Sequence, residues 1–121
     1  MTRRILVVDK DPAIRNLLRR LFERRGHDVA EAGSANAALA RFTAEHFDLI
    51  ITEVELQGSS GVWLLERVRS LRPDVPIILL AAGGGLDSQE SWRRASAIVQ
   101  KPFPLRELDE KVQHLLELTT R

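Results

Sequence analysis

The sequence predicts an α/β domain: a doubly wound parallel β-sheet with helices on both of its faces. Three observations favour this class. Short apolar runs alternate with amphipathic stretches about five times along the 121 residues. Several runs are rich in β-branched residues and lack polar alternation, which is typical of strands buried on both faces. The stretches between them have the length of the right-handed helical crossovers that join parallel strands.

The first predicted strand and helix have clear boundaries. Residues 5–8 form an apolar, β-branched run that ends at Asp9. Asp11 is a helix N-cap candidate, and Pro12 occupies the favoured first helical position. Apolar residues then recur at helical spacing until Gly26, which is expected to end the helix.

The middle of the chain repeats this pattern. Residues 27–31 are a shorter, weaker strand candidate, and Ser34 can cap a second helix. Residues 47–52 form a strongly apolar strand that runs directly into Glu53. A polar, glycine-containing loop is expected over 55–61.

The last third supplies the remaining elements. A third helix is predicted from Val62 until Arg72-Pro73 stops it. An apolar strand follows over 76–81, and a modest helix is predicted over about 87–95. Residues 97–100 form a short strand, and a leucine-rich stripe from 105 to 116 predicts a final helix.

Composition excludes several classes of function. With 18 Lys and Arg against 17 Asp and Glu, the net charge of +1 gives no basic footprint for nucleic acid. The absence of Cys excludes disulfides, a thiolate zinc site and a cysteine nucleophile. No apolar run reaches the roughly 18 residues of a membrane span. We therefore expect one cytoplasmic domain over residues 1–121, without an output domain, a membrane partner or a nucleic-acid partner.

Charged side chains gather where the predicted strands end. Asp9 and Lys10 follow the first strand, Glu53 follows the third and Lys101 follows the fifth. In open α/β sheets, functional sites form beyond the carboxyl ends of the strands. Two carboxylates and two ammonium groups are therefore expected to meet in one crevice.

Four segments carry a resemblance to a known family: residues 5–12, 47–53, 58–61 and 101–103. In order and approximate spacing they resemble the receiver domain of two-component response regulators, and the resemblance spans essentially the whole chain. It implies a flavodoxin-like sheet with strand order 2-1-3-4-5. It also implies a signalling partner, either a histidine kinase or another regulator.

In that family a histidine kinase supplies a phosphoryl group to an Asp at the end of the third strand. An acidic pair after the first strand holds Mg²⁺, helped by a backbone carbonyl. A Thr or Ser after the fourth strand and a Lys before Pro contact the phosphoryl oxygens. An aromatic residue on the fifth strand often rotates with the switch.

This sequence departs from the family pattern at the metal and acceptor positions. Asp9 matches the first acid of the pair, but Lys10 stands where the second acid, a direct metal ligand, is expected. Glu53 stands at the acceptor Asp. Glu55 occupies the position whose carbonyl completes the metal shell, and Lys101 is retained.

The switch positions differ as well. Ala81 replaces the Thr or Ser, and Ile98 falls at the switch aromatic. Gln57 replaces the usual Pro of the loop after the acceptor. The stretch from residue 81 to residue 101 is about two residues shorter than the family pattern.

The local charge balance suggests what Lys10 does. Asp9, Lys10, Glu53 and Lys101 sum to zero without a metal, whereas the family pocket sums to −2. Our hypothesis is that the Lys10 ammonium replaces the cation and pairs with Glu53 and Asp9. The alternative is that Lys10 points into solvent, as most lysines do. Either arrangement predicts poor Mg²⁺ binding, and no other cofactor is expected.

These departures predict a degenerate receiver, a pseudo-receiver. It would not be an enzyme and would act as a phosphorylation-independent protein-interaction module. Glu53 is one methylene longer than Asp, and misplacing a reacting group by about 1 Å can cost on the order of 100-fold in rate. Two alternatives stay open: a working phosphoacceptor that uses Glu53, and a small-molecule sensor.

Two tryptophans are candidate interface anchors, because Trp is favoured at protein interfaces. Trp63 lies on the predicted third helix and Trp92 on the short fourth one; burial of both rings is the alternative. Receiver-like domains commonly pair through the face made by the fourth helix, fifth strand and last helix. A homodimer through that face would include Trp92.

Overall fold

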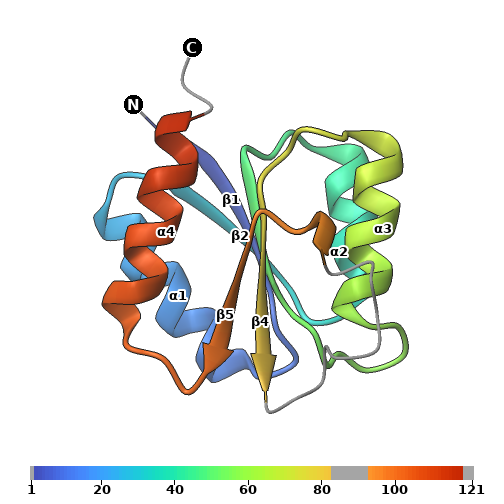
Figure 1. Ribbon diagram of the computed structural model, residues 1–121, viewed down its shortest axis with the longest axis horizontal. Coiled ribbons are helices and arrows are strands. Elements are labelled where there is room, and N and C mark those ends of the chain that lie inside the picture. Colours follow the sequence, from blue (N-terminus) through green and yellow to red (C-terminus); the bar gives the residue numbers. More distant parts are fainter. Residues whose placement is uncertain (1, 83–92, 119–121) are drawn as a thin grey trace.

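The computed structural model describes residues 2–82 and 93–118, which form a parallel sheet between two layers of helices (Figure 1). The strands are β1 (Arg4–Val8), β2 (Asp28–Ala32), β3 (Leu49–Glu53), β4 (Ile77–Ala82) and β5 (Ala97–Lys101). All neighbouring strands are parallel, in the order β2-β1-β3-β4-β5. The predicted fold class and strand order are confirmed.

The helices divide between the two faces of the sheet. They are α1 (Pro12–Arg24), α2 (Ala35–Ala44), α3 (Gly61–Leu71) and α4 (Leu105–Leu118). In Figure 1, α1 and α4 cover one face while α2 and α3 cover the other. A doubly wound sheet is buried in this way because each crossover helix must place its apolar stripe on one face.

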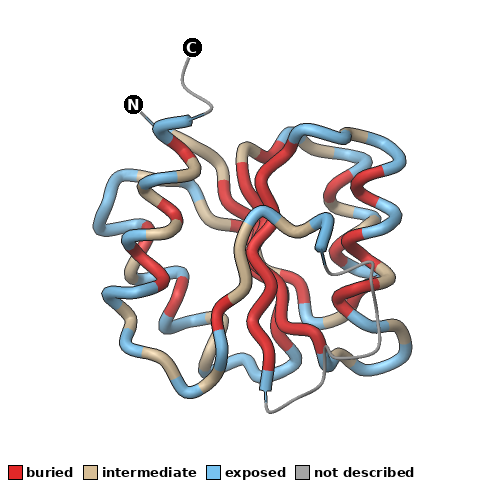
Figure 2. Tube along the Cα trace, viewed as in Figure 1, coloured by how far each residue is buried: buried red, intermediate tan, exposed pale blue. Residues whose placement is uncertain are grey.

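Two apolar clusters lie on either side of the sheet and are separated by the strand backbones. Ile5 and Val7 pack towards α1 and α4, whereas Leu6 and Val8 pack towards α2 and α3. This alternation follows from the period of two along a strand. Figure 2 shows the consequence, with the central strands buried along their length.

The predicted helix signals act as expected. The Asp11 carboxylate accepts a hydrogen bond from the amide of Ala13, and the Ser34 hydroxyl accepts one from the amide of Ala37. Gly26 follows the end of α1 with φ +88°, a conformation that an L side chain rarely adopts. These three residues fix where α1 and α2 begin and where α1 ends.

Most strand boundaries lie within one residue of the predicted ones, and two regions differ more. β3 begins at Leu49 rather than at residue 47; just before it, Asp48 is held to Arg4 by its amide, which donates to the Arg4 carbonyl, and by its carboxylate, which accepts from the Arg4 amide, both at 2.8 Å. The helix predicted over 87–95 lies mostly outside the described residues, and residues 93 and 94 form a 3-10 turn rather than an α-helix. Within the described ranges, no helix is long and apolar enough to cross a membrane.

Candidate functional site at the carboxyl edge of the sheet

The carboxyl ends of the strands bring the predicted site residues together. Asp9 directly follows β1, Glu53 is the last residue of the adjacent β3, and Lys101 is the last residue of β5. Because the strands are parallel, these ends meet at one edge of the sheet. The expected crevice of two carboxylates and two ammonium groups is therefore present.

The backbone of Glu53 is held by the start of α3. The amide of Gly61 donates to the carbonyl of Val54 at 2.8 Å. A Cβ atom on Gly61 would lie 2.2 Å from the carbonyl oxygen of Glu53. Only glycine permits this approach of helix to strand, so Gly61 fixes the end of β3 that carries the acceptor position.

Asp9 is fully buried and is held from three sides. Only 1% of the residue is exposed, and its Oδ1 atom accepts a hydrogen bond from the Asp11 amide at 2.9 Å. Its Oδ2 atom lies 3.5 Å from the Lys101 ammonium. The Arg15 guanidinium donates to the Asp9 backbone carbonyl at 2.7 Å.

Glu53 is buried and surrounded by donors. Only 4% of the residue is exposed. One carboxylate oxygen, Oε2, accepts a hydrogen bond from the Lys10 amide at 2.7 Å. The other, Oε1, lies 3.5 Å from the Lys101 ammonium and 3.7 Å from the Lys10 ammonium.

Lys10 turns towards the site rather than away from it. Its Nζ atom lies 3.7 Å from Glu53 Oε1 and donates to the backbone carbonyl of Glu55 at 3.3 Å. The side chain keeps 48% of its surface exposed, so its charge meets the site from the solvent side. The hypothesis named Asp9 as the second partner of Lys10; in the structure Glu55 takes that place and Lys101 faces Asp9.

The proximity of two carboxyl groups affects Glu53. Its pKa is raised, first because burial removes the carboxylate from water and next because the side chain of Asp9 lies beside it. The amide of Lys10 and the ammonium of Lys101 act in the opposite direction. Glu53 is therefore a carboxyl group whose charge is disfavoured by its surroundings despite two nearby lysines.

The side chains at this edge of the sheet do not fit Mg²⁺. In the described parts of the chain, no group of three or more Asp, Glu, His or Cys side chains could hold a metal ion. Mg²⁺ requires about six oxygen ligands in near-octahedral geometry, normally with carboxylates among them. Here an ammonium already contacts the Glu53 carboxylate and the Glu55 carbonyl.

The two switch positions lie together but lack polar groups. Ala81 is buried near the end of β4, and Ile98 is half-buried on β5. Both belong to the apolar cluster on the α2 and α3 side of the sheet. A methyl group cannot donate a hydrogen bond to a phosphoryl oxygen, so this corner of the site is purely a packing surface.

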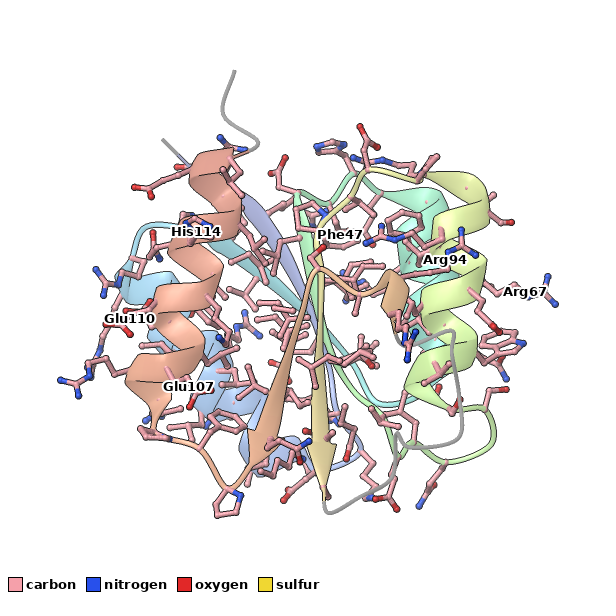
Figure 3. The ribbon with its side chains drawn as sticks, in the orientation of Figure 1. Phe47, Arg67, Arg94, Glu107, Glu110 and His114 are labelled. Atoms are coloured by element: carbon pink, nitrogen blue, oxygen red, sulfur yellow. The ribbon has the colours of Figure 1, made fainter. Side chains whose placement is uncertain are left out.

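The tryptophan predictions have different outcomes. Trp63 is half-buried on α3, where the Arg67 guanidinium lies 5.2 Å from its ring. Figure 3 shows Arg67 pointing away from α3 into solvent. The role of Trp63 as an interface anchor stays a prediction. Trp92 lies outside the described residues.

Sequence reasoning missed Arg15, which links the site to the rest of the domain. Besides the Asp9 carbonyl, its guanidinium contacts the Glu31 carboxylate at 3.1 Å. Glu31 in turn pairs with Arg19 on the exposed side of α1. The position of Arg15, four residues after the Asp11 N-cap, placed it within reach of the loop, but the sequence did not show which carbonyl it would bind.

Comparison with known proteins agrees with the geometry. A sequence profile described as the response regulator receiver domain matches residues 5–113, which is most of the chain. The chain belongs to this family. The family is the receiver domain of two-component response regulators, whose members interact with histidine kinases or other signalling proteins.

Three similar proteins illustrate the range of the family. The chain is 29% identical over 120 residues to sporulation initiation phosphotransferase F of Bacillus subtilis (strain 168), covering 98% of this chain and 97% of that protein. Response regulator protein TrrA from Thermotoga maritima, solved in complex with Mg²⁺–BeF, superposes with a TM-score of 0.87 at 37% identity, covering 93% of this chain and 98% of TrrA.

The third relative is much longer. The chain is 38% identical over 119 residues to the DNA-binding transcriptional regulator NtrC of Azospirillum brasilense, covering 96% of this chain but 24% of that protein. The receiver domain thus corresponds to about a quarter of NtrC and to nearly all of phosphotransferase F.

Proposed function

We propose that this receiver domain is a phosphorylation-independent protein-interaction module in which the Lys10 ammonium takes the place of the metal ion. One observation carries the proposal. Lys10 Nζ lies between the Glu53 carboxylate, at 3.7 Å, and the Glu55 carbonyl, at 3.3 Å. By resemblance to the family, these are two of the groups that face the metal.

Charge balance supports the same conclusion. Asp9 and Glu53 carry two negative charges, and Lys10 and Lys101 carry two positive ones at the same edge. A divalent cation entering this site would meet an ammonium group and only two carboxylates. Without a bound divalent cation, the charge that develops on a transferring phosphoryl group lacks its main stabiliser.

The acceptor and switch positions support it further. Both oxygens of Glu53 are engaged, one by the Lys10 amide and the other by two ammonium groups. Ala81 offers no donor to register a phosphoryl group. We therefore propose that the output surface of the domain is set by its fold rather than by phosphorylation, and that the chain is not an enzyme.

The proposed partner is a signalling protein, either a histidine kinase or another regulator. The net charge of +1 favours a protein surface over nucleic acid. A homodimer through the face that contains β5 and α4 remains part of the proposal. We also propose a cytoplasmic location, on the family resemblance.

The direct test is exposure to phosphoryl donors. The chain is incubated with acetyl phosphate and Mg²⁺, and in parallel with beryllofluoride and Mg²⁺. We expect no gain of 80 Da in intact mass, the mass of an HPO₃ group, and no shift of the Glu53 and Ala81 NMR resonances. Stoichiometric, Mg²⁺-dependent modification at Glu53 would contradict the proposal. The matched control is the triple variant Lys10→Asp, Glu53→Asp, Ala81→Thr, which restores the family pattern and should respond.

One contact favours a second candidate, a working receiver that uses Glu53 as acceptor. Lys101, the family residue that contacts phosphoryl oxygens, lies 3.5 Å from Glu53 Oε1. The same acetyl phosphate experiment separates the two candidates. Modification that is lost in the Glu53→Gln variant would favour the working receiver.

A further inference from the structure

An apolar pocket of about 430 Å³ lies between α1 and the connection from β5 to α4. Six apolar side chains line it: Ile14, Leu17, Leu18, Pro102, Phe103 and Leu105. Figure 1 shows α1 and α4 on the same face of the sheet, with the end of β5 leading into the connection beside them. The volume falls in the range of about 300–1,000 Å³ that small-molecule sites occupy.

The pocket leaves a large apolar side chain exposed. Leu17 keeps 44% of its surface in contact with solvent, although its neighbour Leu18 is buried in the core. Leu71 and Leu118 are the other large apolar side chains exposed in the described ranges, and neither lines this pocket. A bound apolar group would remove Leu17 from water, which is favourable in proportion to the area covered.

A second hollow of about 190 Å³ continues the pocket along α1. It shares Leu17 and Leu105 with the first pocket and adds the side chains of Arg20, Leu21 and Arg24. No acidic side chain is among the described residues that line either hollow. The apolar pocket therefore opens at one end onto two guanidinium groups.

The two guanidinium groups differ from others on the same helix. Arg19 pairs with Glu23 and Glu31, and Arg15 pairs with Glu31. Arg20 and Arg24 have no acidic partner within 4.0 Å in the part of the chain that the structure describes. Glu23 lies near them, but its carboxylate is already paired with Arg19. Their positive charge is available to an anion.

We propose that this pocket binds a small amphipathic anion, an unbranched alkyl chain that ends in a carboxylate. The chain would fill the apolar pocket between Leu17, Phe103 and Leu105. The carboxylate would accept hydrogen bonds from Arg20 and Arg24, because guanidinium groups match carboxylates in charge and planar geometry. Because the apolar pocket adjoins the two guanidinium groups, a ligand with an apolar chain and an anionic end fits better than a purely apolar or a purely anionic one.

The pocket also touches the site at the carboxyl edge. Lys101 lines it, and the ammonium of the same side chain pairs with Asp9 and Glu53. A ligand that packs against Lys101 would shift the position of its ammonium group. The ligand would thereby alter the pairing with Asp9 and Glu53 without any phosphorylation. This regulatory step rests on the proposed function, whereas binding to the pocket does not.

The test begins with a ligand series. The full chain is titrated with octanoate, decanoate and dodecanoate below their micelle concentrations, by calorimetry and by NMR. We expect affinity to rise about fourfold for each added methylene until the pocket is filled. Decanol, which keeps the chain but lacks the charge, should bind about tenfold more weakly than decanoate. Equal affinities for decanoate and decanol would overturn the assignment of an anion.

Variants locate the site. The double variant Arg20→Gln, Arg24→Gln should reduce decanoate affinity to that of decanol and leave decanol binding unchanged. Leu17→Gln should weaken both ligands, whereas the matched control Leu71→Gln, exposed on α3, should weaken neither. Resonance shifts concentrated on α3 would contradict the proposal. Binding of an acidic amphipathic peptide at Leu17 and Arg24, with no binding of any alkyl ligand, would also overturn it in favour of a protein partner.

The outcomes separate this proposal from the proposed function. Phosphorylation at Glu53 would end the phosphorylation-independent function but would leave the decanoate series untouched. Absence of decanoate binding would end the ligand proposal and leave the acetyl phosphate result as it stands. If decanoate binds without moving the Lys101 and Glu53 resonances, binding is kept and coupling to the site is wrong.

Discussion

The two edges of the sheet use buried charge in opposite ways. At the carboxyl edge, the buried carboxylates of Asp9 and Glu53 are compensated by Lys10 and Lys101. At the amino edge, only 8% of the residue Arg69 is exposed, and its guanidinium donates to neutral oxygens rather than to an acid. A buried charge is tolerated when it is paired or fully hydrogen-bonded, and each edge meets a different one of these conditions.

The difference separates a structural role from a functional one. Arg69 ties α3 to the carbonyls of Val75 and Arg94 and to the Ser96 hydroxyl, and so fixes the residues that precede β5. The carboxyl edge instead concentrates two acids, and the pKa of Glu53 is raised first by its burial and next by the Asp9 side chain beside it. Carboxyl groups whose pKa is shifted in this way cluster at functional sites.

The largest expected effect tests the amino edge. The variant Arg69→Met should lower the free energy of unfolding by about 3 kcal/mol, because it removes the donors to the buried carbonyl of Val75 and to the partly buried carbonyl of Arg94. Chemical denaturation monitored by circular dichroism measures this change. The control Arg67→Met removes an exposed guanidinium from the same helix (Figure 3) and should change stability by less than about 0.5 kcal/mol. Equal effects of the two variants would show that Arg69 is no anchor.

The next effect tests the carboxyl edge by comparing its two lysines. Lys101→Met should lower the free energy of unfolding by about 1–3 kcal/mol, because it strands the buried Asp9 carboxylate and weakens the pairing of Glu53. Lys10→Met should cost less than about 1 kcal/mol, since nearly half of that side chain is exposed and its ion pair is screened by water. A larger loss from Lys10 than from Lys101 would reverse our ranking of the two ammonium groups.

The smallest effect is a pH dependence. A carboxyl group with a raised pKa binds its proton more tightly in the folded state, so its contribution is present at low pH and is lost as the pH rises through the folded pKa. Glu53→Gln removes this loss. The thermal midpoint of the variant minus that of the original chain should therefore increase as the pH rises from about 4 to about 7. A difference between the two proteins that does not change with pH would contradict the raised pKa.

Much of the fold could be predicted from the sequence because its signals are local. Apolar runs such as residues 5–8 are predicted to be buried because they carry no polar side chain for the surface. Helix caps such as Asp11 and Ser34 bind backbone amides two or three residues away. The meeting of Asp9, Glu53 and Lys101 followed from parallel topology alone. The part of the predicted fourth helix before residue 93 and the role of Trp92 as an interface anchor stay predictions, because they lie outside the described residues.

The finer arrangement could not be predicted because it depends on distant contacts. Either lysine could have faced either carboxylate, and only the three-dimensional setting places Lys101 against Asp9 and Lys10 against the carbonyl of Glu55. The contact of Arg15 with the Asp9 carbonyl was missed because every residue has a backbone carbonyl, so the sequence does not indicate which one a side chain will bind. The pocket beside Leu17 was missed because it arises where α1 meets the connection after β5.

The central claim is that Lys10 stands in for the metal ion, and a Mg²⁺ titration of the original chain and the Lys10→Asp variant tests it most directly. Amide resonances of residue 10, Glu53 and Glu55 are followed by NMR at millimolar Mg²⁺. We predict no saturable shift in the original chain and a saturable shift in the variant, with affinity at least about tenfold higher because a cation has been exchanged for a ligand. Saturable Mg²⁺ binding by the original chain, with no gain in the variant, would contradict the account.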